Sequence, residues 1–213
     1  MRVDVFTLVP HAFAWLTEQR PIAGILGGEL ELRLFNYRDT TPLRAGQVDD
    51  EPYGGGAGMV LRVDVVSAAL EAAYGDARPK RVIALTPQGR PLTQAVVEEL
   101  AVEDEVTLLS SRFEGFDERI VEHLATDAVS IGPYVLSNGE LPAMVLLDAV
   151  ARRLPGALAE GSGELESFSA ELGGALEYPH YTRPPEFRGW TVPDVLLSGD
   201  HARIDRWRKE HVR

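Results

Sequence analysis

Cysteine is absent from the 213-residue chain, so neither a disulfide nor a zinc site with thiolate ligands can form. No apolar run approaches the length of a membrane span. The first residues also lack the basic and then apolar layout of a secretory signal peptide. From these absences we expect a cytoplasmic protein with no membrane partner.

Lysine and arginine are scarce: 21 of them stand against 33 aspartates and glutamates, which gives a net charge of −12. Binding to nucleic acid normally leaves a basic footprint, so the overall charge argues against a nucleic-acid partner. An acidic protein can still carry a basic patch. Basic residues do gather near the end of the chain, at Arg203, Arg206, Arg208, Lys209 and Arg213. Taken alone, this cluster indicates a solvated terminal helix.

Apolar, β-branched segments alternate with segments of helical spacing along the chain. Residues 3–7, 81–85, 106–110 and 128–131 have the composition of buried strands. Residues 29–35 alternate apolar and charged side chains, which is typical of a half-exposed strand. Helical periodicity is found between these strands and, most extensively, in residues 141–154. Strands that alternate with helices predict an α/β fold with a mainly parallel sheet and helices on both faces.

A stretch rich in glycine, alanine and serine, residues 155–162, interrupts this pattern. Such a composition is typical of a linker. The sequence therefore predicts two regions, a larger one over residues 1–160 and a smaller one over residues 161–213.

Three of the expected strands end in segments that carry glycine and polar residues, at 84–89, 111–119 and 130–140. Ligands of parallel sheets bind at the carboxyl ends of the strands, so these segments predict one shared pocket. The third segment bends at Gly132-Pro133 and again at Asn138-Gly139, just before a helix. An ordinary strand–turn–helix junction is the simpler alternative for that stretch by itself.

A glycine-rich loop contains Gly54, Gly55, Gly56 and Gly58. Closely spaced glycines let backbone amides approach a bound group, so a phosphate cradle is one interpretation and a flexible linker is the other. No Lys-Ser/Thr pair follows, so the loop is not a Walker motif. An enzyme that handles a phosphate group is therefore the weaker functional hypothesis.

Six motifs occur in order along the whole chain. They are Asp49-Asp50-x-Pro52-Tyr53-Gly54-Gly55-Gly56-x-Gly58-Met59, Pro87-Gln88-Gly89-Arg90, Arg112-x-Glu114-Gly115-x-Asp117-Glu118-Arg119, Ser130-Ile131-Gly132-x-Tyr134-Val135-Leu136-Ser137-x-Gly139-Glu140-Leu141-Pro142-Ala143-Met144, Pro179-His180-Tyr181-Thr182-Arg183-Pro184 and Leu196-Leu197-Ser198-Gly199-x-His201. Each is weak alone. Together they resemble the bacterial tRNA (guanine-N1)-methyltransferase family (TrmD) of the SPOUT superfamily.

The resemblance implies an α/β fold whose C-terminal part forms a trefoil knot, followed by a small helical region. It also implies a homodimer whose active site is shared between the subunits. The expected activity is transfer of a methyl group from S-adenosylmethionine to N1 of the guanine at tRNA position 37, next to the anticodon. Magnesium (Mg2+) is implied as a further requirement, with no site assigned to it and no metal-binding residues.

The resemblance also assigns roles to residues. The cofactor would be held by Leu85, Thr86, Pro87, Gln88, Ser111, Phe113, Glu114, Gly115, Ser130, Ile131, Gly132, Tyr134, Val135, Leu136, Asn138 and Gly139. The tRNA would be held by Asp50, Tyr53, Gly54, Gly55, Gly56, Gly58, Ser162, His180, Tyr181 and Arg183. Glu166 would be the base that removes the guanine N1 proton, with Glu164 as a second candidate, and Arg152 would stabilise charge on O6.

Three positions depart from the family pattern. Glu166 stands where the family has aspartate, Ser111 where it has glycine, and Asn138 where it has the first of two glycines. The chain also ends at Arg213, where the family continues through a helical domain that contacts tRNA, so residues 161–213 are expected to be a shortened form of that region. These departures favour one alternative hypothesis, a catalytically impaired paralogue that binds cofactor or RNA without turnover.

Overall fold

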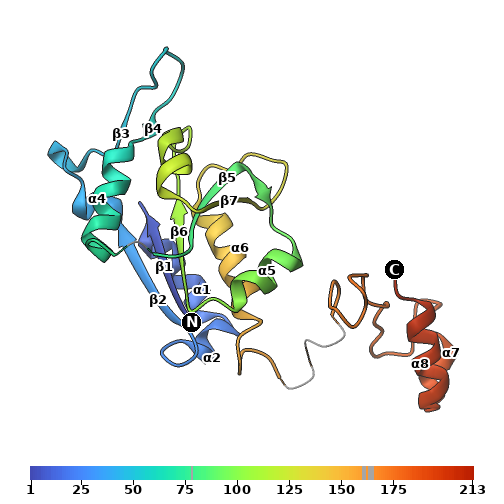
Figure 1. Cartoon of the computed structure of the whole chain (residues 1–213). Helices are drawn as coiled ribbons and strands as arrows, with labels where there is room; N and C mark the ends of the chain where they lie inside the picture. Colours follow the sequence, from blue (N-terminus) through green and yellow to red (C-terminus); the bar gives the residue numbers. More distant parts are fainter. Residues whose placement is uncertain (78, 160–161, 163–165) are drawn as a thin grey trace. The chain divides into compact units, whose positions relative to one another are not determined.

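The computed structural model describes residues 1–77, 79–159, 162 and 166–213 (Figure 1). It divides into two compact units, Met1–Leu158 and Ala159–Arg213. Among the described residues, no helix is both long enough and apolar enough to cross a membrane.

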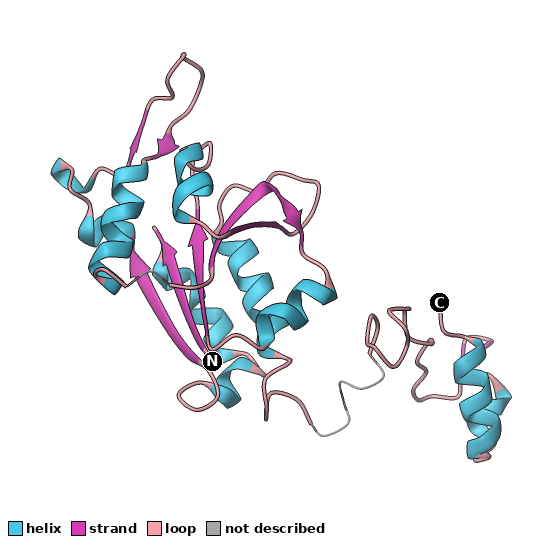
Figure 2. Ribbon diagram, viewed as in Figure 1, coloured by secondary structure: helices cyan, strands magenta, loops and turns pink. Residues whose placement is uncertain are grey.

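A five-stranded sheet forms the centre of the first unit (Figure 2). Its strands are β1 (Arg2–Thr7), β2 (Glu31–Asn36), β5 (Val82–Pro91), β6 (Glu105–Ser110) and β7 (Asp127–Ser130). They lie in the order β2-β1-β6-β5-β7, and every neighbouring pair is parallel. The predicted parallel sheet is therefore confirmed. Two further short strands, β3 (Asp49–Asp50) and β4 (Val60–Leu61), form a separate antiparallel pair.

Helices cover both faces of this sheet, as predicted. One face is packed by η1 (Pro10–Phe13), α1 (Ala14–Glu18), α2 (Ile22–Ile25), α5 (Gln94–Ala101) and α6 (Glu140–Ala151). The other is packed by α3 (Tyr37–Thr40), α4 (Val63–Tyr74) and η3 (Ile120–Leu124), and the short η2 (Arg44–Gly46) follows α3. Successive strand residues face opposite sides, so Val5 joins the first core cluster and Phe6 the second.

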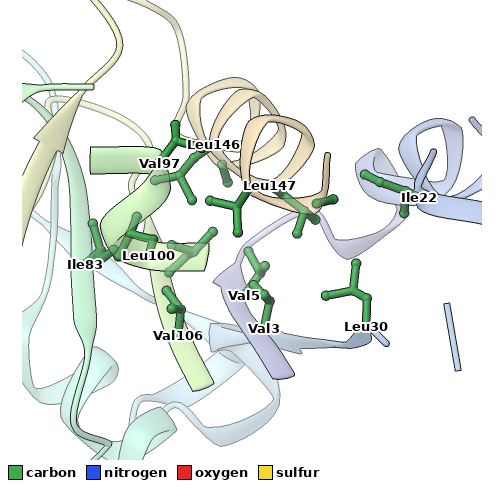
Figure 3. Close-up of a cluster of buried hydrophobic side chains, with 14 of the residues drawn as sticks. Val3, Val5, Ile22, Leu30, Ile83, Val97, Leu100, Val106, Leu146 and Leu147 are labelled. Carbon is green, nitrogen blue, oxygen red and sulfur yellow. The ribbon is translucent and has the colours of Figure 1, made fainter. Parts of the chain in front are cut away.

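The larger core cluster lies between the sheet and helices α5 and α6 (Figure 3). Val97 and Leu100 of α5 meet Leu146 and Leu147 of α6 there, and all four side chains are buried. Burial of a side chain of this size contributes roughly 1.5–3 kcal/mol to folding. This packing fixes α6 against the sheet, and α6 begins directly after the third of the predicted ligand loops.

Strand β5 is longer than the predicted strand 81–85, because it resumes after an interruption. Leu85 and Arg90 both pair with Val129, so residues 86–89 bulge out between them. A Cβ on Gly89 would lie 2.4 Å from the backbone nitrogen of Val129, so a larger residue would not fit there. The proline and glycine in this segment are typical of a turn, which is why the predicted strand ends too early. The bulge projects at the carboxyl end of the sheet.

The second unit contains a small hairpin and two helices. The hairpin pairs β8 (Glu186–Phe187) with β9 (Trp190–Thr191), and α7 (Asp194–Leu197) and α8 (His201–Glu210) follow it. The basic cluster predicted to be helical lies on and just after α8, whose Asp200 side chain accepts a hydrogen bond from the Arg203 backbone N–H at 3.1 Å. The described part of this unit has no buried residue.

Candidate functional site

The carboxyl ends of β5, β6 and β7 lie side by side, and the segments that follow them enclose a pocket. The empty volume of the pocket is about 650 Å³, which includes the part that is open to solvent. The sheet therefore places a pocket where the sequence predicted one.

The pocket brings together every residue assigned to the cofactor except Gln88, whose side chain is exposed on the bulge of β5. Its lining is Leu85, Thr86, Pro87, Ser111, Arg112, Phe113, Glu114, Gly115, Val129, Ser130, Ile131, Gly132, Tyr134, Val135, Leu136, Ser137, Asn138, Gly139 and Pro142. Arg112, Val129, Ser137 and Pro142 were not predicted from the sequence to hold the cofactor. All four lie within or beside the predicted loops, so proximity along the chain was the signal that could have found them.

Gly139 joins two of the pocket walls. Its N–H donates to the Ser111 carbonyl at 2.7 Å, and its own carbonyl accepts from the Ser110 hydroxyl at 3.1 Å. A Cβ at Gly139 would lie 2.6 Å from the Ser111 nitrogen. The segment that leads into α6 can therefore lie against the end of β6 only if residue 139 is glycine.

The loop after β7 is held by its own hydrogen bonds. The Ser130 hydroxyl donates to the Gly132 carbonyl at 3.0 Å, and the Tyr134 hydroxyl donates to the Ile131 carbonyl at 3.1 Å. A Cβ on Gly132 would lie 2.3 Å from the Tyr134 ring, so this glycine is needed for the ring to fold back over the loop. The shape of the loop is thus stabilised by hydrogen bonds within the loop itself.

The residues of the pocket fit a ligand that is held largely through backbone groups. Two of its walls meet at a glycine that leaves no room for a side chain, which brings backbone atoms close to the enclosed space. The Asn138 Oδ1 atom is buried and has no hydrogen-bond partner among the described residues. A buried acceptor of this kind is available to a polar group of a ligand.

The glycine-rich loop is attached to the same pocket. The Glu114 N–H donates to the Met59 carbonyl at 2.9 Å, and the Leu61 N–H donates to the Gly115 carbonyl at 3.0 Å. A Cβ on Gly58 would meet the Glu114 side chain at 2.4 Å. The root of the loop therefore lies against the pocket wall that Glu114 forms.

The other residues assigned to tRNA in the first unit lie along this loop. Gly54, Gly55, Gly56 and Gly58 all have positive φ angles, from 80° to 138°, which side chains other than glycine rarely adopt. Tyr53 is fully exposed. The Asp50 carboxylate accepts from Arg62 Nη1 at 2.8 Å, so it is part of an ion pair at the base of the loop.

Electrostatic interactions next to the pocket involve Asp117 and Arg119, which follow Glu114 and Gly115. Asp117 accepts from Arg119 Nε at 2.9 Å and from Nη2 at 2.6 Å. These bonds lower the pKa of Asp117 below its ordinary value, and they outweigh the opposite effect of partial burial. Asp117 is therefore ionised at neutral pH and is bound to Arg119.

A buried polar cluster that was not predicted from the sequence begins at Glu140, directly after Gly139. Glu140, the first residue of α6, is 3% exposed and accepts from the Thr7 hydroxyl at 2.6 Å. Burial raises the pKa of Tyr37, and the nearby charge of Glu140 raises it further. The only sequence signal was an acidic residue in the first turn of a helix, which is also common at exposed helix starts.

The two residues assigned to catalysis are not in the pocket lining. Arg152 follows the last residue of α6, so it lies about 20 Å along the helix axis from Gly139. Glu166 is half-buried in the second unit. The alternative base Glu164 lies outside the described residues.

The remaining residues assigned to tRNA also belong to the second unit. Ser162 is exposed, His180 Nε2 lies 2.8 Å from Glu177 Oε2, and the Tyr181 ring packs edge-on against Trp207. Arg183 is exposed. Within the described residues, no group of three or more histidine, aspartate or glutamate side chains could hold a metal ion.

Comparison with known proteins gives a consistent result. A family model described as tRNA (Guanine-1)-methyltransferase TrmD matches residues 1–213. A tRNA (guanine-N(1)-)-methyltransferase of Brevibacillus brevis is 50% identical over 216 residues, which cover 100% of this chain and 87% of the relative. Proteins of the same name from Dehalococcoides mccartyi (strain CBDB1) and from an Exiguobacterium species are 48% and 47% identical. They are matched over 99% of this chain and over 85% and 87% of their own lengths.

Proposed function

The chain belongs to the tRNA (guanine-1)-methyltransferase family, and from this we propose that it methylates N1 of the guanine at tRNA position 37. The methyl donor of such an enzyme is S-adenosylmethionine. The observation that carries the proposal is the pocket at the carboxyl ends of β5, β6 and β7, which collects nearly all of the residues expected to hold this cofactor.

S-adenosylmethionine, when bound, supplies an electrophilic methyl group on a sulfonium sulfur. The pocket residues hold and orient the cofactor, and the close packing at Gly139 keeps their positions fixed. A fixed orientation matters because methyl transfer requires an in-line approach, and a displacement of about 1 Å can lower the rate roughly a hundredfold. The bulge of β5 and the loop after β7 both line this pocket.

Guanine N1 carries a proton that must leave when the methyl group arrives. In the proposed reaction the Glu166 carboxylate takes this proton and Arg152 stabilises negative charge on O6. The N1–H bond and the sulfur–methyl bond break, and the N1–methyl bond forms. Asp50 and the Gly54–Gly58 loop hold the RNA. The base is turned out of its stack, which is least costly in a single-stranded loop.

We propose that two copies of the chain share each active site. Arg152 lies at the end of α6 remote from the pocket of its own chain. Leu141 and Val145 precede it on the same face of α6, because they lie eleven and seven residues before it. Both are large apolar side chains that are nearly half exposed. An exposed apolar stripe that ends in the catalytic arginine supports burial of this face against a second subunit.

The path of the chain supports the trefoil knot as a further part of the proposal. After β7, at the edge of the sheet, the chain returns past β5 to the end of β6, where Gly139 bonds to Ser111 before α6 begins. Basic residues on α8 make the second unit the proposed tRNA-contacting region. We also propose a requirement for Mg2+ and, because tRNA is the substrate, a cytoplasmic location.

The test is methyl transfer from labelled S-adenosylmethionine, with Mg2+, to two tRNA transcripts that carry guanine or adenine at position 37. Label on the guanine transcript alone is expected. Cofactor binding by calorimetry with no label on either transcript would favour the impaired paralogue suggested by Glu166 and Ser111. Absence of cofactor binding would contradict the proposed role of the pocket.

A further inference from the structure

A second hollow adjoins the candidate cofactor pocket. Its lining consists of Leu8, Val9, Arg38, Arg112, Phe113 and Ser137. Arg112, Phe113 and Ser137 also line the cofactor pocket, so the two spaces share a wall. Phe113 has a φ of 61°, in the left-handed region that bulky residues rarely adopt. Such backbone strain is found most often at functional sites.

The charge of this second hollow is positive, although the protein as a whole is acidic. Among the described residues that line it, Arg38 and Arg112 are the only ones with ionisable side chains. Most arginines of the first unit form ion pairs with carboxylates, namely Arg2, Arg33, Arg62, Arg81, Arg90, Arg119 and Arg153. Within the described part of the chain, neither Arg38 nor Arg112 has such a partner. Two uncompensated guanidinium groups on one hollow attract an anion.

Arg38 is also held in position. Its Nη1 donates to the Gly46 carbonyl at 2.6 Å, and its backbone N–H donates to the Asn36 side chain at 3.0 Å. A guanidinium has five N–H donors, so the bond to Gly46 leaves the others for a ligand. Pairs of such donors match the oxygens of a phosphate group, and this geometry makes arginine a frequent phosphate ligand.

We propose that this hollow, the arginine hollow, binds a backbone phosphate of the RNA strand beside the methylated guanine. The inference rests on the proposed function, because it assigns a subsite to the same RNA substrate. The wall shared with the cofactor pocket puts the phosphate next to the base that reacts. A grip on phosphate positions the strand without reading its sequence. Phe113, 45% exposed on the shared wall, offers an apolar surface on which a base can stack.

The first test uses the full-length chain and an anticodon stem-loop RNA with guanine after the anticodon. Arg38→Glu is compared with Lys80→Glu, which makes the same change in charge. Lys80 is exposed just ahead of β5, at the opposite end of the sheet. We expect Arg38→Glu to weaken RNA binding by about tenfold or more, with unchanged affinity for S-adenosylmethionine. Lys80→Glu is expected to bind RNA within about twofold of wild type, and Arg38→Lys to recover part of the loss.

The second test removes the charge from the RNA instead. A stem-loop with a neutral methylphosphonate next to the target guanine should bind about tenfold more weakly to the wild type. It should bind the Arg38→Glu variant no more weakly than the unmodified RNA does, because the interaction is already lost. The salt dependence of RNA binding should also fall, by about 0.7 in logarithmic slope for each single-strand phosphate contact removed.

Several outcomes would overturn the inference. If wild type methylates RNA but Arg38→Glu and Lys80→Glu bind RNA equally well, the proposed role of the arginine hollow is wrong and the proposed function stands. Additive losses from the protein and RNA changes would show that the phosphate contacts another residue. A parallel loss of cofactor affinity in Arg38→Glu would mean that Arg38 supports the pocket. If the wild type binds no RNA, both proposals fail.

Discussion

Single glycines decide how closely the walls of the pocket approach one another. Gly139 lies between the end of β6 and the start of α6, where its two backbone hydrogen bonds leave no space for a Cβ atom. Its φ of −86° is ordinary for any residue, so the requirement is purely steric. The nearest atoms belong to backbone, which cannot move aside as a flexible side chain can.

Gly139→Ala is therefore expected to separate Ser111 from the start of α6 and to weaken binding of S-adenosylmethionine about tenfold, which corresponds to a loss of roughly 1.4 kcal/mol of binding free energy. Calorimetric titration with the cofactor measures the effect. Gly24→Ala, in α2, is the control, because a Cβ there would meet nothing within 4 Å. Equal cofactor affinities in the two variants would show that the contact at Gly139 is unimportant.

Glu166 carries the proposed proton transfer. Glu166→Gln keeps the size of the side chain but removes the base, so the rate constant of methyl transfer is expected to fall by about 10²–10⁴ while cofactor affinity is retained. Glu171→Gln, on an exposed residue of the same unit, should leave both unchanged. Single-turnover methylation assays measure the rates. A Glu166→Gln variant that methylates as fast as wild type would mean that another group takes the proton.

Because Asp117 and Arg119 form an ion pair, we expect the free energy of unfolding to depend on pH. The pKa of Asp117 is lowered in the folded state, so the ion pair stabilises the fold above the ordinary pKa of aspartate, about 4. The contribution is lost as the pH falls through the lowered pKa. The difference in urea midpoint between wild type and Arg119→Ala should therefore shrink when the pH is reduced from 7 to 3. A difference that stays constant would contradict this assignment.

At the scale of elements, α6 connects the site to the core. Its first turn follows Gly139 at the pocket, its middle packs on α5 and the sheet, and Arg152 follows its last turn. A shift of this helix would move the pocket wall and the arginine together. The packing between α5 and α6 is therefore part of what positions the site (Figure 3).

Two valines on or beside α5 test this packing. Val97 is 3% exposed against α6, whereas Val102, just after the end of α5, is 84% exposed. Val97→Ala is expected to lower the free energy of unfolding by roughly 1–3 kcal/mol, because it removes two buried carbons and leaves a small cavity. Val102→Ala should change it by less than about 0.5 kcal/mol. Urea denaturation of both variants measures the difference, and similar values would contradict tight packing at Val97.

At the scale of the whole molecule, the proposed reaction needs residues from both units. The pocket lies in the first unit, whereas Glu166 and several residues assigned to tRNA lie in the second. The described part of the second unit buries no residue of its own. A region with so little core is expected to gain stability from a partner surface, either RNA or a second subunit.

Complementation tests whether subunits share the site. Gly139→Val, which blocks the pocket, and Glu166→Gln, which lacks the base, should each be inactive alone. In an equal mixture about half of the dimers are mixed, and each then has one complete site, so about a quarter of wild-type activity should return. If each site is made within one subunit, no activity will be regained.

The sequence alone determined the α/β class, the parallel sheet and the three loops that line the pocket. These features follow from local periodicity and from the fact that carboxyl ends of parallel strands share one edge. The motifs also identified the family, which the comparisons establish over residues 1–213.

Only the tertiary structure decided which side chains meet. The bulge that leaves Gln88 out of the pocket lining depends on the register between β5 and β7. Arg38 and Arg112 line the same hollow because of the strand order. Arg38 is in α3, which follows β2, and Arg112 follows β6. Only β1 lies between these two strands in the sheet. Register and strand order are set by burial among segments that are distant along the chain. No local pattern of residues encodes such contacts, so the arginine hollow could be found only in the folded molecule.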